Sequence, residues 1–492
     1  MIPTSPEHLD LGKPDWRPFQ REALQDIAEA SDKKYHALCA PTGSGKSLIA
    51  LGLGRYLLGN YDGRTIILTS TKALQDQYVR DFGIPKAIGR GNFRCAEEPS
   101  ISAEDAWCTF SPGGDRGCPS RDRCMYLLQR NAALAAPISV LNYPMFLGLF
   151  NTGDLPSPEL VVCDEGHNLE KALIDFGTVE FTDRELPGDW RSWSRASDCA
   201  AWAKARARKL ADKGTTNTLD ADDRRLLRRL SSLLSVDNTG WVLQQFPRYV
   251  RVRPLWGSSV SDALFAHASR FLIMSATLMP ATLEAAGLAS EDWSWHDVPS
   301  TFPPENRPVY LWPVTAVNAK TSTEEYDELA AALDYVIARE MPAKGMIHMA
   351  SGKLQERLLG LSKYGRIIRT HSTKDRLEVL DAFKQAQTGI LSSPSMMEGI
   401  DMPDDLLRWQ VIPKTPFADL GDPVVAARAR DNPAWYTQDA ISKMVQAAGR
   451  GVRHKEDRCS TWILDKHAWW LYARHAAWWP LSVRQAVVRI RR

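Results

Sequence analysis

Long apolar runs are missing from this chain of 492 residues: no segment approaches the roughly 20 consecutive apolar residues that a membrane-spanning helix needs. A secretory pattern is missing as well, because the first residues are MIPTSPEHLDLGK. We therefore expect no membrane association and a cytoplasmic location, in a bacterium or in a phage-infected cell.

An excess of either charge is also missing. The 61 lysines and arginines are balanced by 59 aspartates and glutamates, which leaves a formal net charge of +2. Binding to a polyanion through overall charge is not indicated, so any contact with nucleic acid must come from local surfaces. No short internal repeat is present, and a chain of this length predicts two large domains rather than one core.

An export signal is missing, so the eight cysteines of the chain are not expected to form a disulfide framework. Four of its eight cysteines nevertheless gather within thirty residues: Cys95, Cys108, Cys118 and Cys124. They lie in a stretch rich in Gly, Arg and Pro, which has too little apolar periodicity to form a core of its own. Four thiolates can hold a zinc ion or an iron–sulfur cluster, and gaps of twelve, nine and five residues lack the close pairs common in structural zinc sites. This spacing favours a cluster, with zinc or metal-free cysteines as the alternatives.

The segment APTGSGKS, Ala40 to Ser47, has the composition of a phosphate-binding loop. Apolar residues precede it and LIALGLGRYLL follows it, which predicts a strand, a glycine-rich turn and a helix. Glycines let backbone N–H groups approach the β- and γ-phosphates, the lysine adds a positive charge, and the serine offers a hydroxyl to Mg²⁺. We expect the nucleotide to be bound by Thr42, Gly43, Ser44, Gly45, Lys46 and Ser47.

An acidic pair further along the chain complements this loop. The apolar run from Leu160 to Cys163 predicts a buried parallel strand that ends at Asp164. A carboxylate at that position can hold Mg²⁺, and Glu165 beside it can polarise the water that attacks the γ-phosphate. The loop and the acidic pair together predict hydrolysis of ATP with Mg²⁺.

Hydroxyl residues follow another strand-like run, RTIIL. Thr69, Ser70, Thr71 and Lys72 come directly before a helix-like segment. Hydroxyls and a helix N-terminus at a strand end suit the phosphate oxygens of a nucleic-acid backbone. We therefore expect these four residues to contact nucleic acid.

The second half of the chain predicts another parallel α/β domain, because strand candidates alternate with helical stretches after the proline-rich segment 296–308. There, QAAGRGVR places Gln446, Arg450 and Arg453 at what looks like the start of a helix. Arginines offered by a second domain can neutralise the charge that develops on the γ-phosphate. The site would then lie between two domains, neither of which holds it alone.

Three other segments give weaker predictions. In SMMEGIDMP, Glu398 and Asp401 follow a strand and can orient the arginines or sense the nucleotide. Residues 168–262 are charged and compatible with helix, and the basic tail RQAVVRIRR also predicts a helix.

Taken in order, these motifs resemble those of superfamily 2 helicases, and the cysteine segment is similar to the iron–sulfur branch that includes XPD and the bacterial DinG helicases. The segments CPSRDRC, VLNYPMF and PFADLGDP resemble DinG most closely. Two positions depart from the pattern, because Met396 and Met397 replace an aromatic pair and Asp404 stands where a glycine is usual.

The resemblance implies an α/β fold of two RecA-like parallel-sheet domains, with an iron–sulfur insertion and a small helical arch in the first. The implied first domain comprises residues 1–89, 136–167 and 263–300, interrupted by the iron–sulfur insertion at 90–135 and the arch-like insertion at 168–262; the second domain comprises 301–492.

The resemblance also implies a function. We expect a monomeric, ATP-dependent DNA helicase that translocates 5′ to 3′ on single-stranded DNA and unwinds forked duplexes. A [4Fe–4S] cluster on the four cysteines, nucleotide recognition by Arg17 and Gln20, and strand contacts by Asn142 and Tyr143 are implied with it. Two alternatives stay open: an RNA or RNA–DNA hybrid helicase, since backbone contacts distinguish the sugars weakly, and an ATP-switched recruitment module that does not unwind.

Overall fold

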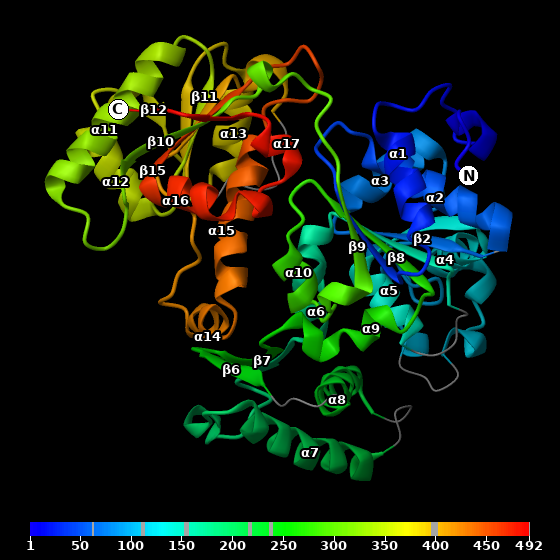
Figure 1. Ribbon diagram of the computed structural model, residues 1–492. Coiled ribbons are helices and arrows are strands. Elements are labelled where there is room, and N and C mark those ends of the chain that lie inside the picture. The colour runs from blue at the N-terminus through cyan, green and yellow to red at the C-terminus, as the bar shows by residue number, and fades with distance from the viewer. Residues whose placement is uncertain are drawn as a thin grey trace.

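The computed structural model describes residues 1–61, 63–109, 114–151, 157–214, 219–235, 240–394 and 402–491. Two lobes, each built on a parallel sheet, lie side by side, and a smaller projection of helices and short strands lies below them in the view of Figure 1. Across these described ranges, no helix is both long and apolar enough to cross a membrane.

The first lobe is built on a six-stranded parallel sheet with the order β3-β2-β4-β8-β1-β9. Its strands are almost continuously apolar because both faces are covered: Ala37 and Cys39 belong to one core and Leu38 to the other. The strands are β1 (Tyr35–Cys39), β2 (Thr65–Thr69), β3 (Ile138–Asn142), β4 (Leu160–Asp164), β8 (Arg270–Ser275) and β9 (Trp293–Asp297). The helices of this lobe are α1 (Gln20–Glu29), α2 (Lys46–Tyr61), α3 (Lys72–Phe82), α4 (Met125–Ala135), α5 (Tyr143–Phe150), α9 (Asp262–Phe265) and α10 (Pro280–Ala285).

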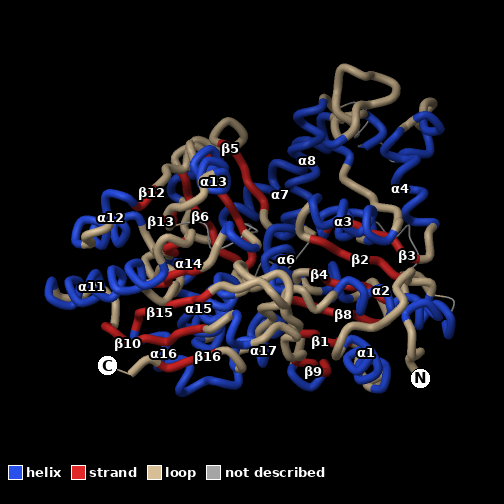
Figure 2. Tube along the Cα trace, turned by 90° about the horizontal axis from the view of Figure 1, so that it is seen from above, coloured by secondary structure: helices blue, strands red, loops and turns tan. Residues whose placement is uncertain are grey.

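The second lobe repeats this design with seven parallel strands in the order β12-β13-β11-β14-β15-β10-β16. The strands are β10 (Val309–Thr315), β11 (Gly345–His348), β12 (Ile368–Arg369), β13 (Ile390–Ser393), β14 (Trp409–Ile412), β15 (Ser460–Asp465) and β16 (Val487–Arg489). The helices are α11 (Thr323–Glu340), α12 (Gly352–Leu361), α13 (Arg376–Gln385), α14 (Pro423–Asp431), α15 (Pro433–Ala448), α16 (Lys466–His475) and α17 (Leu481–Arg484). Figure 2 shows the two sheets beside each other with helices around both, which confirms the predicted fold class.

The segment after β4 forms the projection, and it is less helical than the sequence predicts. Besides α6 (Leu169–Gly177), α7 (Ala196–Lys213) and α8 (Ala221–Leu234), it contains the antiparallel strands β5 (Val179–Thr182), β6 (Trp241–Phe246) and β7 (Tyr249–Pro254), paired in the order β5-β7-β6. In β7 the sequence YVRVRP alternates apolar residues with arginine. That period of two is the strand signal that the high charge of the segment obscures.

The basic tail is not a helix, which corrects the prediction made for RQAVVRIRR. Its residues Val487–Arg489 form β16, which pairs in parallel with β10 at the edge of the second sheet. The β-branched side chains of Val487, Val488 and Ile490 favour an extended backbone, and pairing satisfies the backbone groups of β10 on that side.

Candidate nucleotide and nucleic-acid site

The phosphate-binding loop connects β1 to α2, as the sequence predicts. Gly43 and Gly45 have φ angles of 81° and 77°, a left-handed conformation that side chains disfavour. A Cβ atom on Gly43 would lie 2.3 Å from the ring of Phe302, and one on Gly45 would lie 2.3 Å from the side-chain amide of Gln20. Both positions therefore require glycine for conformation and for space.

Arg17 and Gln20 hold this loop from the side of α1. The Arg17 guanidinium donates a hydrogen bond of 2.8 Å to the carbonyl of Gly43, and the Gln20 amide donates to the carbonyls of Ser44 at 2.8 Å and Gly45 at 3.2 Å. Gln20 also accepts from the Arg17 backbone N–H at 2.8 Å and is 1% exposed. The two residues fix the backbone of the loop, and the adenine recognition expected of them stays a prediction.

Ser47 and Asp164, the expected Mg²⁺ ligands, are joined by a residue that the sequence analysis missed. The Tyr78 hydroxyl, which α3 carries into the interior, donates to Asp164 Oδ2 at 2.7 Å and is hydrogen-bonded to Ser47 as well. Burial raises the pKa of Asp164 to about 6, while the charge of Lys46 and the hydrogen bond from Tyr78 oppose that rise. A cation bound here would favour the ionised carboxylate.

Glu165 has a φ angle of 52°, a left-handed conformation that is uncommon for a residue with a side chain. Such conformations cluster at functional sites, where the surroundings hold them in place. Burial acts to raise the pKa of Glu165, but the hydrogen bond with His167 and the charges of Lys46 and Arg453 outweigh it and lower that pKa. The carboxylate is therefore ionised and can orient a water molecule.

A polar path leads from Glu165 to the second lobe. His167 Nδ1 lies 3.3 Å from Glu165 Oε2 and 2.8 Å from the hydroxyl of Ser275, the last residue of β8. The Ser275 and Thr277 hydroxyls are 3.4 Å apart, and the Gln446 amide of α15 donates to Thr277 Oγ1 at 3.4 Å. The acidic pair of one lobe and the arginine segment of the other are thus connected through side chains.

Arg450 and Arg453 follow a helix instead of starting one, which corrects the prediction from QAAGRGVR. Helix α15 ends at Ala448, and Gly449 caps it by donating its N–H to the helix carbonyls. Glycines at 449 and 451 weaken the helix at this point because they lack helix-favouring side chains. Arg450 is 6% exposed. The carbonyl of Arg453 lies 3.3 Å from the point that a Cβ atom on Gly43 of the phosphate loop would occupy.

Phe302, in the proline-rich linker, fills the space between the lobes. Its ring packs with the apolar cluster of the second lobe that includes Val452, and it also touches Gly43 of the first lobe. A cavity of about 60 Å³ beside it is lined by Thr42, Gly449 and other residues of both lobes. In the sequence, the feature that could have indicated this contact is an aromatic residue within a linker rich in proline.

Of the residues expected to contact nucleic acid, Ser70, Thr71 and Lys72 are exposed at the end of β2. The Thr71 hydroxyl caps α3 by accepting from the N–H of Leu74 at 3.3 Å. Asn142 is partly exposed and caps α5 in the same way, accepting from Met145 N–H at 2.9 Å. These four residues surround two helix N-termini, where backbone N–H groups favour anions.

Thr69 and Tyr143 are buried, with exposures of 0% and 2%. Contrary to the expectation from the sequence, neither side chain reaches the surface. The Thr69 hydroxyl donates to the Thr71 carbonyl at 3.3 Å, and the Tyr143 ring belongs to the core of the first lobe. Glu398 and Asp401 lie outside the described residues, so their roles stay predictions.

The four cysteines lie between α3 and α4, in a segment whose described part contains only short 3₁₀ turns. Cys95, Cys108 and Cys118 are buried and pack together with Ala106, and Cys124 is half-buried directly before α4. Two donors approach the sulfur atoms. The Glu98 N–H lies 3.4 Å from Cys95 Sγ, and the Arg90 guanidinium lies 3.8 Å from Cys108 Sγ.

The chemistry of this donor set decides which metal groups it can hold. Three buried thiols pack together and a fourth lies directly before α4, which makes four thiolate ligands available in one segment. Four thiolates fit an iron–sulfur cluster, and they also fit a tetrahedral zinc ion. N–H donors to the sulfurs, such as those from Glu98 and Arg90, are among the groups that tune such clusters.

Comparisons with known proteins agree with this geometry. Residues 337–480 match the family described as helicase C-terminal domain, and residues 13–191 match the family described as type III restriction enzyme, res subunit. A segment of 70 residues is 39% identical to the ATP-dependent DNA helicase uvsW of Enterobacteria phage T4, and it spans 14% of this chain and 13% of that protein.

Solved structures of XPD helicases share the fold over the whole chain. One matches with a TM-score of 0.62 at 17% identity and covers 96% of this chain and 99% of its own. Xpd4 of S. tokodaii matches with a TM-score of 0.59 at 15% identity and covers 96% of this chain and 100% of its own.

Each family model matches less than half of the chain, and the XPD structures are at most 17% identical to it, so the structural likeness shows a shared fold. In its family matches and its two parallel-sheet lobes the chain is similar to superfamily 2 helicases of the XPD/DinG type. The closer resemblance to DinG stays a prediction.

Proposed function

We propose that the protein is an ATP-dependent DNA helicase that translocates 5′ to 3′ on single-stranded DNA and unwinds forked duplexes. The observation that carries this proposal is the divided site. The first lobe supplies the phosphate loop and Glu165, and the second brings the backbone carbonyl of Arg453 to Gly43 and its charge close enough to lower the pKa of Glu165. ATP would favour closure of the lobes and hydrolysis would release them, which is the cycle of a translocating motor.

DNA as the substrate is supported by the exposed residues at the ends of β2 and β3. Ser70, Thr71, Lys72 and Asn142 offer hydroxyl, ammonium and amide groups beside helix N-termini, which suits a phosphate backbone. The phage relative is named a DNA helicase. The polarity of translocation and the monomeric state follow from the resemblance to the iron–sulfur branch.

The four cysteines are proposed to hold a [4Fe–4S] cluster, whose role would be structural. A bound cluster supplies four cross-links to a segment that has only a small core, made of three cysteines and their neighbours. Arg90 would support that site, since it contacts Cys108, pairs with Asp115 and lies over the ring of Tyr126 at 4.5 Å.

The nucleotide site is tested by removing the charge of Lys46 and, separately, the charge of Glu165. Lys46→Ala and Glu165→Gln should each lower strand-stimulated ATP turnover by about 100-fold or more while the affinity for single-stranded DNA stays within about twofold. Lys13→Ala, which removes an exposed lysine outside the phosphate loop, is the matched control. Normal hydrolysis by Lys46→Ala would show that the phosphate-loop assignment is wrong.

The substrate and the direction are tested on the same wild-type sample. DNA strands should stimulate ATP hydrolysis more than RNA strands, and a fork with a free 5′ tail should be unwound in preference to one with a free 3′ tail. Stronger stimulation by RNA would favour the RNA helicase alternative. ATP hydrolysis without unwinding of either fork would favour a recruitment module.

The metal is tested by anaerobic purification. We expect a brown protein with about four irons per chain. Cys108→Ser should lose iron and colour, whereas Cys199→Ala, which changes a buried cysteine of the projection, should keep both. A colourless protein loaded with zinc would contradict the cluster.

A further inference from the structure

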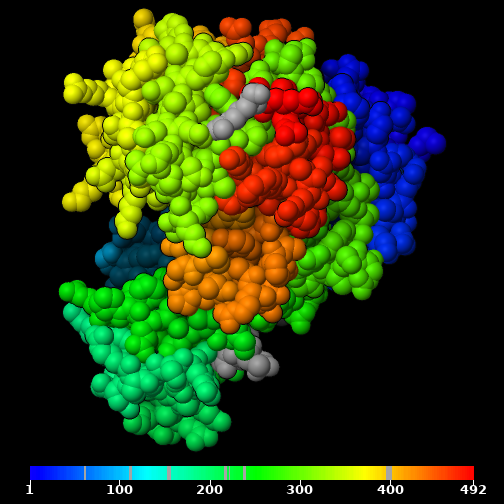
Figure 3. Space-filling model, turned by 60° about the vertical axis from the view of Figure 1, so that its left-hand side comes forward, coloured from blue at the N-terminus to red at the C-terminus, as the bar shows by residue number. Residues whose placement is uncertain are grey.

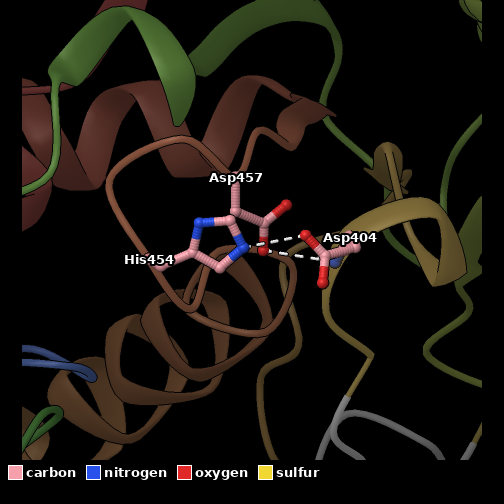
Figure 4. A group of neighbouring side chains, drawn as sticks. All are labelled: Asp404, His454 and Asp457. Atoms are coloured by element: carbon pink, nitrogen blue, oxygen red, sulfur yellow. Dashed lines mark hydrogen bonds and ion pairs between the residues drawn. The ribbon is translucent and has the colours of Figure 1, made fainter.

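Asp404, His454 and Asp457 form a compact group where the segment after α15 meets the segment before β14 (Figure 4). His454 Nε2 and Asp404 Oδ1 are 2.8 Å apart, and both side chains are exposed. Asp457 lies behind them and is 1% exposed. Nothing in the expected site included these residues, although Arg453 lies next to His454 in the chain.

The three ligand atoms are close enough for a cation, within 4.8 Å of one another, but Asp457 has no acceptor position left for one. Its Oδ1 accepts from the Arg408 guanidinium and from the Arg458 N–H, both at 2.8 Å. Its Oδ2 accepts from the backbone N–H groups of Arg453 at 3.1 Å and Asp404 at 3.2 Å. A carboxylate offers about four acceptor sites, and all four are used within the protein.

These four hydrogen bonds connect Arg453 to two other parts of the second lobe. The loop that carries Arg453 follows Gly449 and Gly451, so its backbone has few restraints of its own. Anchoring the Arg453 N–H to a buried carboxylate, itself paired with Arg408, removes that freedom before ATP binds. Placing a charged group in advance lowers the entropic cost of reaching the transition state.

Asp404 adds a second connection to the same loop. Its φ angle is 56°, so the backbone keeps the left-handed conformation that glycine favours, although a side chain is present. That side chain contacts His454, the residue after Arg453. Asp404 therefore keeps a strained backbone conformation, and its side chain contacts the loop that carries Arg453.

We infer that Asp457 is a positioning residue for Arg453. The Asp404–His454 pair is a second and weaker contact that restrains the same loop. The inference rests on the proposed role of Arg453 at the γ-phosphate. The role we assign to this group is to hold Arg453 in position, and not to bind a metal ion.

The test compares Asp457→Asn with Asp405→Asn, which removes a second carboxylate that also pairs with Arg408 but whose side chain is 94% exposed. Asp457→Asn should lower kcat for ATP by about 10- to 100-fold and leave the affinity for ADP within about twofold. Binding of ADP with aluminium fluoride, which mimics the transferred phosphoryl group, should weaken in parallel with kcat. Asp405→Asn should behave as wild type.

Asp404→Gly provides a variant that folds at least as well, since glycine suits φ 56°. Loss of an exposed pair should lower kcat by about two- to fivefold without lowering Tm. The inference is overturned if Asp457→Asn keeps wild-type kcat, or if it loses affinity for ADP and for the aluminium fluoride complex equally. Wild-type kcat in Asp404→Gly alone would refute the role of the Asp404–His454 pair. Arg453→Ala separates the proposed role of Arg453 from its positioning by Asp457. If Arg453→Ala hydrolyses ATP normally, the proposed role of Arg453 fails. If Arg453→Ala is inactive while Asp457→Asn is fully active, only the positioning by Asp457 is refuted.

Discussion

At the scale of single residues, the expected Mg²⁺ ligands depend on a neighbour that carries no helicase motif. Tyr78 brings its hydroxyl between Ser47 and Asp164 while its ring is buried in the core of the first lobe. The sequence places Tyr78 on the apolar face of a helix, where core packing is the ordinary role. Only the packing of α3 against the sheet shows that its hydroxyl meets the Asp164 carboxylate.

Tyr78→Phe removes this hydroxyl and keeps the ring. Because Asp164 loses a donor that orients it, we expect the Mg²⁺ concentration for half-maximal ATP hydrolysis to rise about tenfold, the scale of one hydrogen bond to a charged group. The rate at saturating Mg²⁺ should change little. A Mg²⁺ titration of ATP turnover measures this, with the half-exposed Tyr335→Phe as control; identical titrations for wild type and Tyr78→Phe would contradict it.

At the scale of elements, the second sheet carries a buried polar layer that supports the arginine segment. His348 of β11 contacts the Gln410 carbonyl oxygen of β14 at 2.9 Å. The Gln410 amide donates to the Ala447 carbonyl at the end of α15 at 2.7 Å and to Thr461 of β15 at 2.9 Å. Three strands and a helix end are thereby held in one arrangement, since buried polar groups are costly unless paired.

This layer predicts a pH dependence. Burial lowers the pKa of His348 to about 4 from 6.5, so the folded protein keeps the ring neutral while the unfolded chain takes up a proton below pH 6.5. Stability is therefore lost as the pH falls from 6.5 towards 4, by up to about 3 kcal/mol for this group. His348→Asn should reduce that loss in urea unfolding measured across this range, and the exposed His8→Asn should not. Equal losses in both variants would contradict the assignment.

At the scale of the whole molecule, the two lobes also meet away from the nucleotide. Arg428 of α14 forms a buried ion pair with Glu170 of α6, and its guanidinium lies 4.3 Å from the ring of Trp256 and 3.9 Å from that of Trp435. Figure 3 shows the orange surface around α14 resting on the green surface of the projection. The pair and the two tryptophan rings tie the second lobe to the base of the projection.

Removing this contact should loosen the arrangement. Arg428→Ala leaves Glu170 as a buried, unpaired charge, a change that costs about 3–5 kcal/mol when the structure cannot relax. We expect a lower Tm and a larger radius of gyration in X-ray scattering as the lobes separate. Arg430→Ala, an exposed neighbour on the same helix, is the control. Arg428→Lys should recover only part of the loss, because an ammonium cannot stack on two rings as a guanidinium does; full recovery would show that charge alone matters.

The parts of this protein that could be predicted from the chain alone are those that depend on neighbouring residues. The phosphate loop with Gly43 and Gly45, the strand that ends at Asp164, and the alternation that makes two parallel α/β lobes are all local patterns, and the structure contains each of them. Tertiary structure decided what depends on distant segments meeting. The contact of Tyr78 with Asp164, the anchoring of Arg453 by Asp457 and the pairing of the tail with β10 join residues that no spacing rule connects. Burial explains why, since a hydroxyl, a carboxylate or a strand edge finds its partner only when packing has brought the two together.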